Sequence, residues 1–380
     1  MGLANQDNSI ANTFQKEIQR SDPDKIPIVF LCPQSGYYTF IGKDAAWAAK
    51  YAVDQINANG GINGKKVELI LKDTRSSKSL SSSYFIGAAR EVPVVIGPLD
   101  APSSAQIAPR LAATQTTNIG TYSYEESRKA YGPYTISYMS DSEKGEYFSI
   151  QKWKELNPDI QNVVIFTDST DESKSNSLAL LQQRLPDLHL NVIDVIDVSG
   201  DRDQLHYEKC AIQALNKKAD GYISLLSVED YVNILSQLRK RGVTEGSLIT
   251  ASFTALFPEL FETPAQDLDG TFIWNKFDLN YNSEKWTTLS EAYQRSHQGA
   301  PPLSSIIPEI YDAVIALSQC YEELDLNGTE LDGQNKQRIN EWFYNSRTIH
   351  GINAFSWKNG EKISQYYFFQ FHGDTLSSLS

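Results

Sequence analysis

The feature that most constrains this chain is a regular alternation between short apolar runs and longer stretches with helical spacing. The first run, "IPIVFLC" at 26–32, is continuous and is typical of a buried strand. In residues 42–58, alanines, Val53 and Ile56 recur every three or four positions, which predicts an amphipathic helix. "KVELILKD" at 66–73 follows as the next strand. This order predicts βαβ units and therefore parallel sheets.

The alternation continues in two successive sets. Further strands are predicted at 92–98, 116–123, 161–168, 190–198, 219–227 and 247–252, with helices ending near 90 and at 103–113, 175–185, 204–216 and 229–241. Two such sets imply two α/β lobes with a cleft between them. The tail, "GINAFSWKNGEKISQYYFFQFHG", predicts two strands around an Asn359-Gly360 turn. Residues 1–25 are polar and rich in Asn, Gln, Asp and Ser, which predicts a flexible leader or tether.

The charge balance argues against nucleic acid and anionic membrane surfaces as partners. The chain carries 34 Lys and Arg against 47 Asp and Glu, a formal net charge of −13, with no basic block. No window reaches the ~18 apolar residues of a membrane span, and residues 1–25 lack the apolar core of a secretory signal. The cysteines, at 32, 210 and 320, are widely spaced and odd in number, so they predict neither a disulfide framework nor a zinc site.

One glycine-rich loop, "GGINGKK" at 60–66, invites comparison with a phosphate-binding loop. Phosphate loops follow a strand and precede a helix, so that backbone N–H groups and the positive end of the helix dipole face the anion. Here the predicted order is helix, loop, strand, and the Walker spacing is absent. We therefore interpret Gly60 or Gly61 as the left-handed end of a helix and Gly64 as part of the turn into a strand.

Sequence motifs for catalysis are missing. The chain contains no GxSxG, HExxH or GxGxxG motif, and its five histidines show no metal-ligand spacing. This pattern favours binding without turnover, with no catalytic residues, no cofactor and no metal. An α/β enzyme stays open as an alternative that a search for turnover of a bound compound would test.

Candidate binding residues cluster after the predicted strands, at the edge where α/β folds bind ligands. Tyr37, Tyr38 and Phe40 follow the first strand and either line the cleft or pack within their own loop. Residues 97–104 follow the third strand. Thr121, Tyr122 and Ser123 follow the fourth, and the Thr121 and Ser123 hydroxyls suit a carboxylate or an amide. Ser227 ends a strand of the second set.

Five collinear stretches together carry a family resemblance. They are the segment from "PQSGYYTFIGKDAAW" to "VELILKD" (33–73), "VVIGPLDAPSSAQIAP", "SDSEKG" at 140–145, "PEIYDAVIAL" at 308–317 and "GINAFSWKNGE" at 351–361. In this order they resemble the type I periplasmic binding proteins, in particular the leucine/isoleucine/valine-binding family of ABC-transporter solute receptors. The resemblance spans most of residues 26–372.

The resemblance implies a specific domain organisation. Its fold is α/β, with two doubly wound parallel-sheet lobes joined by three crossing strands, expected near 142–146, 272–277 and 350–354. Lobe 1 is then 26–143 and 275–351, and lobe 2 is 144–274 and 352–380, after a leader at 1–25. The family binds its ligand between the lobes, and hinge closure forms a surface that a membrane permease reads.

The resemblance also implies site residues, and several family positions are altered here. The serine and threonine that hold an amino-acid carboxylate fall at Ala101 and Ser123, so half of that clamp lacks its hydroxyl. The family's lobe 2 acid, which holds the amine of the ligand, aligns near Ser252, and its aromatic residue that packs on the ligand aligns near Asp171. Ser252 cannot neutralise an ammonium, whereas Asp171 does so if its side chain points inward. Asp100 stands where the following helix needs an N-cap and is either only a cap or a cleft residue.

These observations predict an extracytoplasmic solute-binding receptor, periplasmic or lipid-anchored, whose signal segment is absent from this chain. It delivers a small polar or amphipathic metabolite, such as an amino acid or a relative, to an ABC permease. The alternative is a ligand-sensing domain of the same fold coupled to a signalling or regulatory partner. Neighbouring permease and ATPase genes would favour transport, and a neighbouring kinase or regulator would favour sensing.

Overall fold

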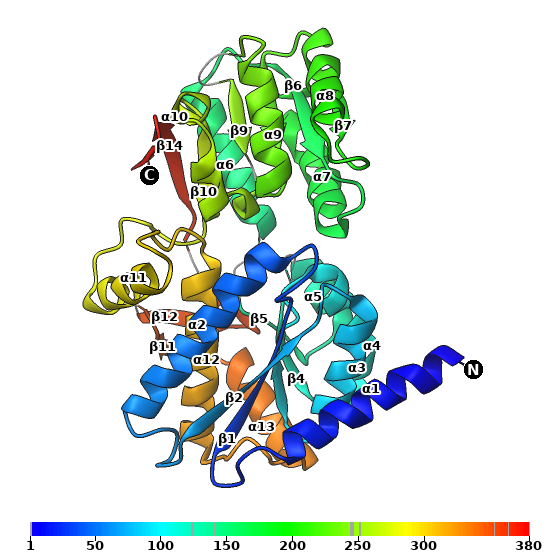
Figure 1. The fold of residues 1–380 in the computed structure, drawn as a ribbon, viewed down its shortest axis with the longest axis vertical. Coiled ribbons are helices and arrows are strands. Elements are labelled where there is room, and N and C mark those ends of the chain that lie inside the picture. The colour runs from blue at the N-terminus through cyan, green and yellow to red at the C-terminus, as the bar shows by residue number, and fades with distance from the viewer. Residues whose placement is uncertain are drawn as a thin grey trace. The chain divides into compact units, whose positions relative to one another are not determined.

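The computed structural model describes residues 2–122, 125–139, 142–243, 247–250, 252–352, 354–363 and 365–379. The chain divides into two compact units (Figure 1). Unit 1 consists of Met1–Asp141 and Ile306–Ser364, and unit 2 consists of Ser142–Ser305 and Gln365–Ser380. Each unit is an α/β layer structure with its own sheet and core, as the sequence predicts.

Unit 1 is built on an eight-stranded sheet in the order β11-β12-β13-β5-β4-β3-β1-β2. The strands from β5 to β2 are parallel, and the β11-β12-β13 meander is antiparallel. Their bounds are β1 (Ile26–Cys32), β2 (Val67–Asp73), β3 (Val94–Ile96), β4 (Thr117–Gly120), β5 (Thr135–Ser137), β11 (Arg347–His350), β12 (Ala354–Lys358) and β13 (Glu361–Ile363).

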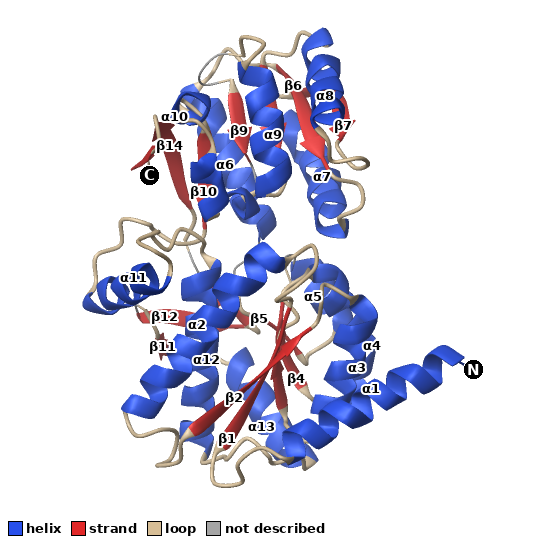
Figure 2. Cartoon of the chain, in the orientation of Figure 1, coloured by secondary structure: helices blue, strands red, loops and turns tan. Residues whose placement is uncertain are grey.

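Helices cover both faces of this sheet (Figure 2). They are α1 (Gly2–Gln19), α2 (Thr39–Ala58), α3 (Lys78–Ala88), α4 (Ala101–Thr114), α5 (Glu125–Tyr131), α12 (Ile306–Leu324) and α13 (Gly333–Tyr344). On one face, Phe14 of α1, Phe85 of α3 and Ile107 of α4 pack in one cluster with Val29 of β1 and Val95 of β3. On the other, α12 packs along α2.

Unit 2 has a seven-stranded sheet in the order β15-β14-β10-β9-β8-β6-β7. Its strands are parallel from β7 to β10, whereas β14 and β15 add an antiparallel edge. Their bounds are β6 (Asn162–Thr167), β7 (Asn191–Asp197), β8 (Gly221–Ser224), β9 (Leu248–Thr250), β10 (Phe272–Asn275), β14 (Tyr367–His372) and β15 (Thr375–Ser378).

Unit 2 also contains helices, most of which lie on the faces of its sheet (Figure 2). They are α6 (Ser142–Leu156), α7 (Glu172–Arg184), α8 (Gln204–Asn216), α9 (Val228–Arg239), α10 (Ala265–Leu268) and α11 (Glu284–Ser296), with short 3-10 turns η1 (Leu185–Leu188), η2 (Phe253–Ala255) and η3 (Pro258–Glu262). Trp153 of α6 and Leu181 of α7 pack with Ile165, Ile223 and Trp274 of the sheet. Helices α8 and α9 pack on each other.

The prediction of a flexible leader at 1–25 is wrong for most of its length. Residues Gly2–Gln19 form α1, and Ala11, Phe14 and Ile18 of this helix are buried. Their spacing of three and four residues is helical, and the stripe packs on α3. The close approach is possible because Gly87 has no Cβ, which would lie 2.5 Å from the Ala11 carbonyl oxygen. The polar composition describes only the outer face of this amphipathic helix.

Two predicted lobe boundaries also differ from the observed units. The first crossing, expected at 142–146, lies next to the observed boundary between residues 141 and 142. The other two differ. The expected return at 272–277 is instead β10, which pairs with β9 and β14 inside unit 2, so residues 275–305 stay in unit 2. The expected crossing at 350–354 falls in the β11-β12 hairpin, and β13 still pairs with β5 of unit 1, so unit 1 continues to 364.

Two turn predictions are confirmed. α2 ends at Ala58, Gly60 and Gly61 have φ of +107° and +82°, and the Gly61 N–H donates to the Ile56 carbonyl at 2.9 Å. The "GGINGKK" loop therefore closes a helix at its carbonyl end. In the tail, Asn359 and Gly360 have φ of 53° and 75° between the antiparallel strands β12 and β13, as expected for a type I′ hairpin.

Candidate functional site

Each sheet has a point at which the order of its strands reverses. In unit 1 the chain runs from β1 to β2 on one side and then to β3 on the other, and in unit 2 it runs from β6 to β7 and then to β8. Open α/β sheets bind ligands at the carboxyl ends of the strands beside such a reversal. The loops after β1 and β3, and those after β6 and β8, are therefore the candidate site of each unit.

An aspartate fixes the loop that follows β1. Asp73, the last residue of β2, accepts hydrogen bonds from the N–H groups of Gln34 and Ser35 at 3.0 and 3.2 Å and from the Ser35 hydroxyl at 2.7 Å. Burial raises the pKa of Asp73, but the hydrogen bonds from Ser35, Arg75 and Gln34 outweigh it and leave that pKa below its usual value. We call Asp73 and Ser35 the unit 1 latch.

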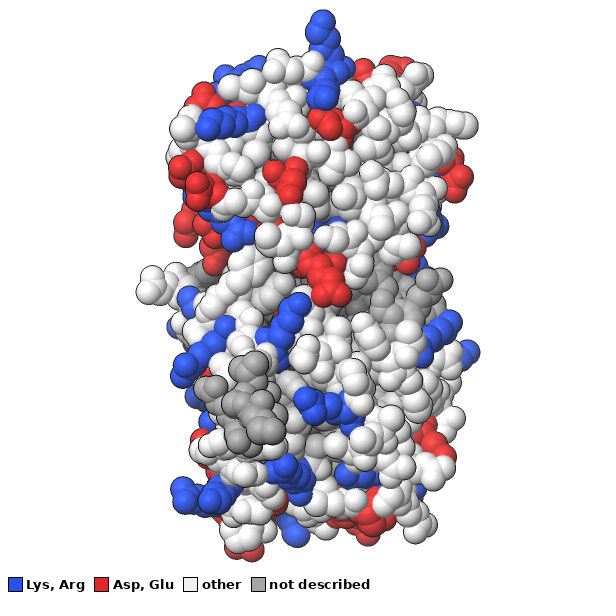
Figure 3. Space-filling model, turned by 90° about the vertical axis from the view of Figure 1, so that its right-hand side faces the viewer, with Lys and Arg blue, Asp and Glu red and all other residues white. Residues whose placement is uncertain are grey.

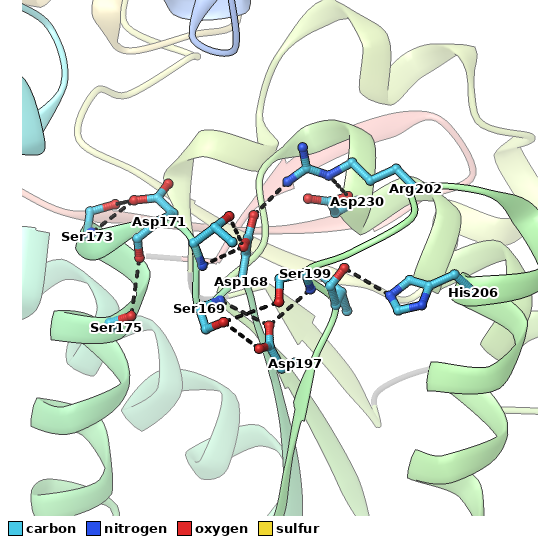
Figure 4. A network of polar contacts seen from close by, with 12 residues as sticks. Asp168, Ser169, Asp171, Ser173, Ser175, Asp197, Ser199, Arg202, His206 and Asp230 are labelled. Atoms are coloured by element: carbon cyan, nitrogen blue, oxygen red, sulfur yellow. Dashed lines mark hydrogen bonds and ion pairs between the residues drawn. The ribbon is translucent and has the colours of Figure 1, made fainter. Parts of the chain in front are cut away.

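Unit 2 repeats this arrangement (Figure 4). Asp197, the last residue of β7, accepts from the Ser169 N–H at 3.0 Å, from the Ser169 hydroxyl at 2.5 Å and from the Ser199 N–H at 3.0 Å. Here too burial raises the pKa of Asp197, and the hydrogen bonds from Ser169 and Ser199 bring it below its usual value. Asp197 and Ser169 form the unit 2 latch, which holds the loop after β6.

The predicted aromatic residues of unit 1 gather beside the latch. Tyr37, Tyr38 and Phe40 form a mutual cluster, with ring centroids 4.8 to 6.5 Å apart. Tyr37 is 38% exposed, whereas Tyr38 and Phe40 are half-buried. The Tyr38 N–H donates to the Ser76 hydroxyl at 2.9 Å, which ties the loop after β1 to the loop after β2. The cluster thus occupies the carboxyl edge at the strand reversal.

The structure confirms Asp100 as a helix cap. Its Oδ1 accepts from the Ser103 N–H at 2.8 Å, and Ala101 is the first residue of α4. Asp100 is buried, and so are Ser103 and Ser104 on the first turn. The carboxylate satisfies part of the helix N-terminus, which reduces the attraction of this end for an anion.

The loop after β4 is anchored by its neighbours. The Thr121 N–H donates to the Ser104 hydroxyl at 3.2 Å, and the Thr121 hydroxyl lies 3.1 Å from that of Tyr138. The Tyr122 hydroxyl donates to Asn118 Oδ1 at 2.7 Å, so its polar end is directed back along β4. Ser123 lies outside the described residues.

In unit 2, the three predicted residues each stand at the N-cap of a helix or 3-10 turn. Asp171 caps α7 and accepts from the Ser173 N–H at 2.9 Å. Ser227 precedes α9 and is buried, without a side-chain cap bond. Ser252 precedes η2 and accepts a hydrogen bond from the Lys174 ammonium at 2.8 Å. Lys174 thus contacts both residues, because its ammonium donates to Ser252 and its backbone N–H donates to the Asp171 carbonyl at 3.1 Å.

The sequence analysis did not identify two buried, ion-paired aspartates of unit 2. Asp168, directly after β6, and Asp230, on the first turn of α9, are each 2% exposed. Arg202 bridges them at 2.6 and 3.1 Å (Figure 4). Burial raises the pKa of Asp230, although the Tyr207 hydroxyl and Arg202 act to lower it. The available signal was the position of Asp168 at a strand's carboxyl end.

Surface charge, metal-ligating residues and helix hydropathy add three observations. Basic and acidic side chains are interspersed on the face that Figure 3 shows. Within the described ranges, no cluster of three or more His, Cys, Asp or Glu has the arrangement of a metal site. In the same part of the chain, none of the helices combines the length and apolar character needed to cross a membrane.

Solved structures share this fold at low sequence identity. Leucine-binding protein LivK of Thermotoga maritima superposes with a TM-score of 0.78 at 19% identity, over 93% of this chain and 98% of that chain. LivJ of Streptococcus pneumoniae in complex with isoleucine gives 0.78 at 17% identity, with the same coverage. A solute-binding protein of Rhodopseudomonas palustris in complex with 3,4-dihydroxybenzoic acid gives 0.74 at 16%, over 91% and 93% of the two chains. No curated protein sequence matches the chain.

The family assignment rests on a match along nearly the whole length. The model of the family described as periplasmic binding protein matches residues 25–375, which include both latches, every described candidate residue and every strand of the two sheets except most of β15. The match agrees with the two α/β units and with the resemblance seen in the sequence. This chain belongs to the periplasmic binding protein family, of the type I fold shared by the LivJ and LivK receptors.

Proposed function

We propose that the chain is the extracytoplasmic solute-binding receptor of an ABC importer. The observation that carries the proposal is the repeated latch: Asp73 in unit 1 and Asp197 in unit 2 each fix the loop at a strand reversal. A loop held in one conformation presents its side chains to a ligand without an ordering cost at the moment of binding. As in the family resemblance, the proposal includes closure of the two lobes on the ligand.

The ligand of this proposal is a small polar or amphipathic metabolite. Aromatic rings beside the unit 1 latch provide apolar contact area, and hydroxyls and charged groups follow neighbouring strands. Receptors of the same fold are described in complex with isoleucine and with 3,4-dihydroxybenzoic acid, so the fold accommodates both amino acids and an acid without an amine. Ala101 lacks the hydroxyl of an amino-acid clamp, which supports a search beyond the branched-chain amino acids.

A thermal-shift screen tests the proposal. The panel contains amino acids, amides, aromatic and aliphatic acids, and polyols. A ligand at 100 times its Kd stabilises the native state by about 2.7 kcal/mol, enough to raise the Tm by a few degrees. No shift across the panel, together with no retained small molecule in native mass spectrometry, would count against a receptor function. A compound consumed during incubation would instead indicate an enzyme.

Ser123 offers a more local test of the same proposal. If its hydroxyl contacts the ligand, Ser123→Ala weakens binding by about 1 kcal/mol or more. Isothermal titration calorimetry of wild type and variant with the best compound from the screen measures the difference. An unchanged Kd would remove Ser123 from the proposed site.

A further inference from the structure

Lys174 of unit 2 carries a buried ammonium group. Lys174 lies on the first turn of α7 and is only 5% exposed. Its Nζ donates to the hydroxyls of Ser252 and Thr254, each at 2.8 Å. A lysine ammonium has three N–H groups, so these contacts use two of them. Among the described residues, no carboxylate lies within ion-pair distance of Lys174 Nζ.

The position of this ammonium coincides with the strand reversal of unit 2. Lys174 lies on α7, which follows β6, whereas Ser252 and Thr254 follow β9. In the sheet, β8 lies between β6 and β9. The Lys174 side chain therefore reaches across the carboxyl end of β8, beside the reversal between β6 and β8. This is the edge at which an α/β sheet receives a ligand.

Four acidic residues lie near enough to interact with Lys174 electrostatically, and each has another partner. Asp168 and Asp230 bind Arg202, Asp171 caps α7, and Glu146 accepts from the Ser177 hydroxyl at 3.0 Å. Burial lowers the pKa of Lys174, and the charges of Asp171, Glu146, Asp168 and Asp230 only partly compensate. A buried cation held by neutral hydroxyls gains from an anion that supplies a charge-assisted hydrogen bond.

We propose that Lys174, oriented by Ser252 and Thr254, binds a carboxylate group of the ligand at the carboxyl edge of the unit 2 sheet. This inference rests on the proposed receptor function and names the ligand class: organic acids that present a carboxylate, without an ammonium, to unit 2. An ammonium at the same place would meet the like charge of Lys174. The chain then selects a carboxylic acid over the amine in which an ammonium replaces the carboxylate.

The test uses matched compounds and the full chain. Calorimetry compares benzoate, 3-phenylpropionate and 4-methylpentanoate with phenylalanine, leucine, 2-phenylethylamine and 3-methylbutylamine. We expect 3-phenylpropionate to bind at least tenfold tighter than 2-phenylethylamine, and 4-methylpentanoate at least tenfold tighter than 3-methylbutylamine. Lys174→Met should weaken binding of the acids at least tenfold, about 1.4 kcal/mol. Lys217→Met, which removes an exposed lysine from its ion pair with Asp194, should leave every Kd unchanged.

A purely structural role for Lys174 predicts a different result. If the lysine only ties α7 to the loop after β9, Lys174→Met lowers the melting temperature of the ligand-free protein and leaves the ranking of acids over amines intact. Lys174→Gln retains hydrogen-bond donors without the charge and replaces the Met variant if that variant fails to fold. Tight binding of an amine, or acid binding that survives both variants, overturns the inference. Failure of the wild type to bind any compound in this set or in the thermal-shift panel overturns the receptor function, and the inference with it.

Discussion

The two units solve the same positioning problem and then diverge. In unit 1 the latch is Asp73 with Ser35, and in unit 2 it is Asp197 with Ser169. Two residues after the latch serine stand Tyr37 in unit 1 and Asp171 in unit 2. Unit 1 thus presents aromatic rings, whereas unit 2 presents an N-cap and a buried charge network. The comparison teaches that the latch is a scaffold, and that residues just beyond it determine the chemistry of each edge.

The largest effect should come from the Arg202 charge network of unit 2. Arg202→Met leaves Asp168 and Asp230 buried without their cation, and we expect a loss of about 3 kcal/mol in unfolding free energy. Urea denaturation measures the loss, and hydrogen exchange should place it in unit 2. Lys217→Met breaks a more exposed pair and should cost under about 1 kcal/mol. Equal costs for the two variants would show that the network adds no more than a surface pair.

A second prediction concerns the backbone of the unit 1 loop. Gly36 has φ of +86°, and a Cβ there would lie 2.6 Å from the Arg75 carbonyl oxygen and 2.8 Å from the Ser76 hydroxyl. Gly36→Ala should therefore destabilise unit 1 by about 2 kcal/mol, through strain and displacement of the loop after β2. Gly132 has φ of +92° with open space around it, so Gly132→Ala isolates the conformational cost, about 1 kcal/mol. A Tm of Gly36→Ala that equals that of Gly132→Ala would contradict close packing of the two loops.

The latches themselves should respond to acid in the same way. Both aspartates have a pKa lowered by folding, so their contribution to stability is present above the unfolded pKa and is lost as the pH falls below about 4. Asp73→Asn and Asp197→Asn should each cost about 1 kcal/mol at neutral pH and reduce the acid sensitivity of the melting temperature. Melting curves from neutral to acidic pH check this. A variant as acid-sensitive as wild type would show that its latch does not titrate as described.

The smallest stability effect is expected at the exposed aromatic ring. Tyr37 is 38% exposed, so Tyr37→Ala should change the unfolding free energy by less than about 0.5 kcal/mol. The variant also tests ligand binding. If the Tyr37 ring contacts the ligand, the affinity of Tyr37→Ala for the ligand falls while the Tm of the ligand-free protein is unchanged. Leu156→Ala, at an exposed position in unit 2, serves as the control that changes neither quantity.

Local pattern was sufficient to predict much of the fold. The buried run "IPIVFLC" and the glycines after Ala58 predict their strand and helix end because adjacent residues determine both. The prediction failed at α1, whose polar composition concealed a stripe of Ala11, Phe14 and Ile18 that needs α3 to be stable. It also failed at β10, because a strand's partners are chosen by distant segments such as β14.

The site was less accessible to sequence reasoning for a related reason. Asp100 could be recognised as a cap because capping depends on the next three residues. Lys174 could not be recognised, because its partners Ser252 and Thr254 lie 78 and 80 positions away and only the sheet order brings them together. Asp168 and Asp230 likewise gain their significance from Arg202, which reaches both from a third loop.

The packing of α1 on α3 gives unit 1 a fixed attachment site for a fluorescent label. Ala11, Phe14 and Ile18 fix the helix, while Lys16 on its outer face is exposed. All three native cysteines are buried, so a Lys16→Cys variant would carry a single reactive thiol for a fluorescent dye. A dye at this position reports the motion of unit 1 itself. Paired with a second label at an exposed site such as Leu205 on α8, it would test whether a candidate ligand changes the distance between the two labels, as the proposed closure predicts.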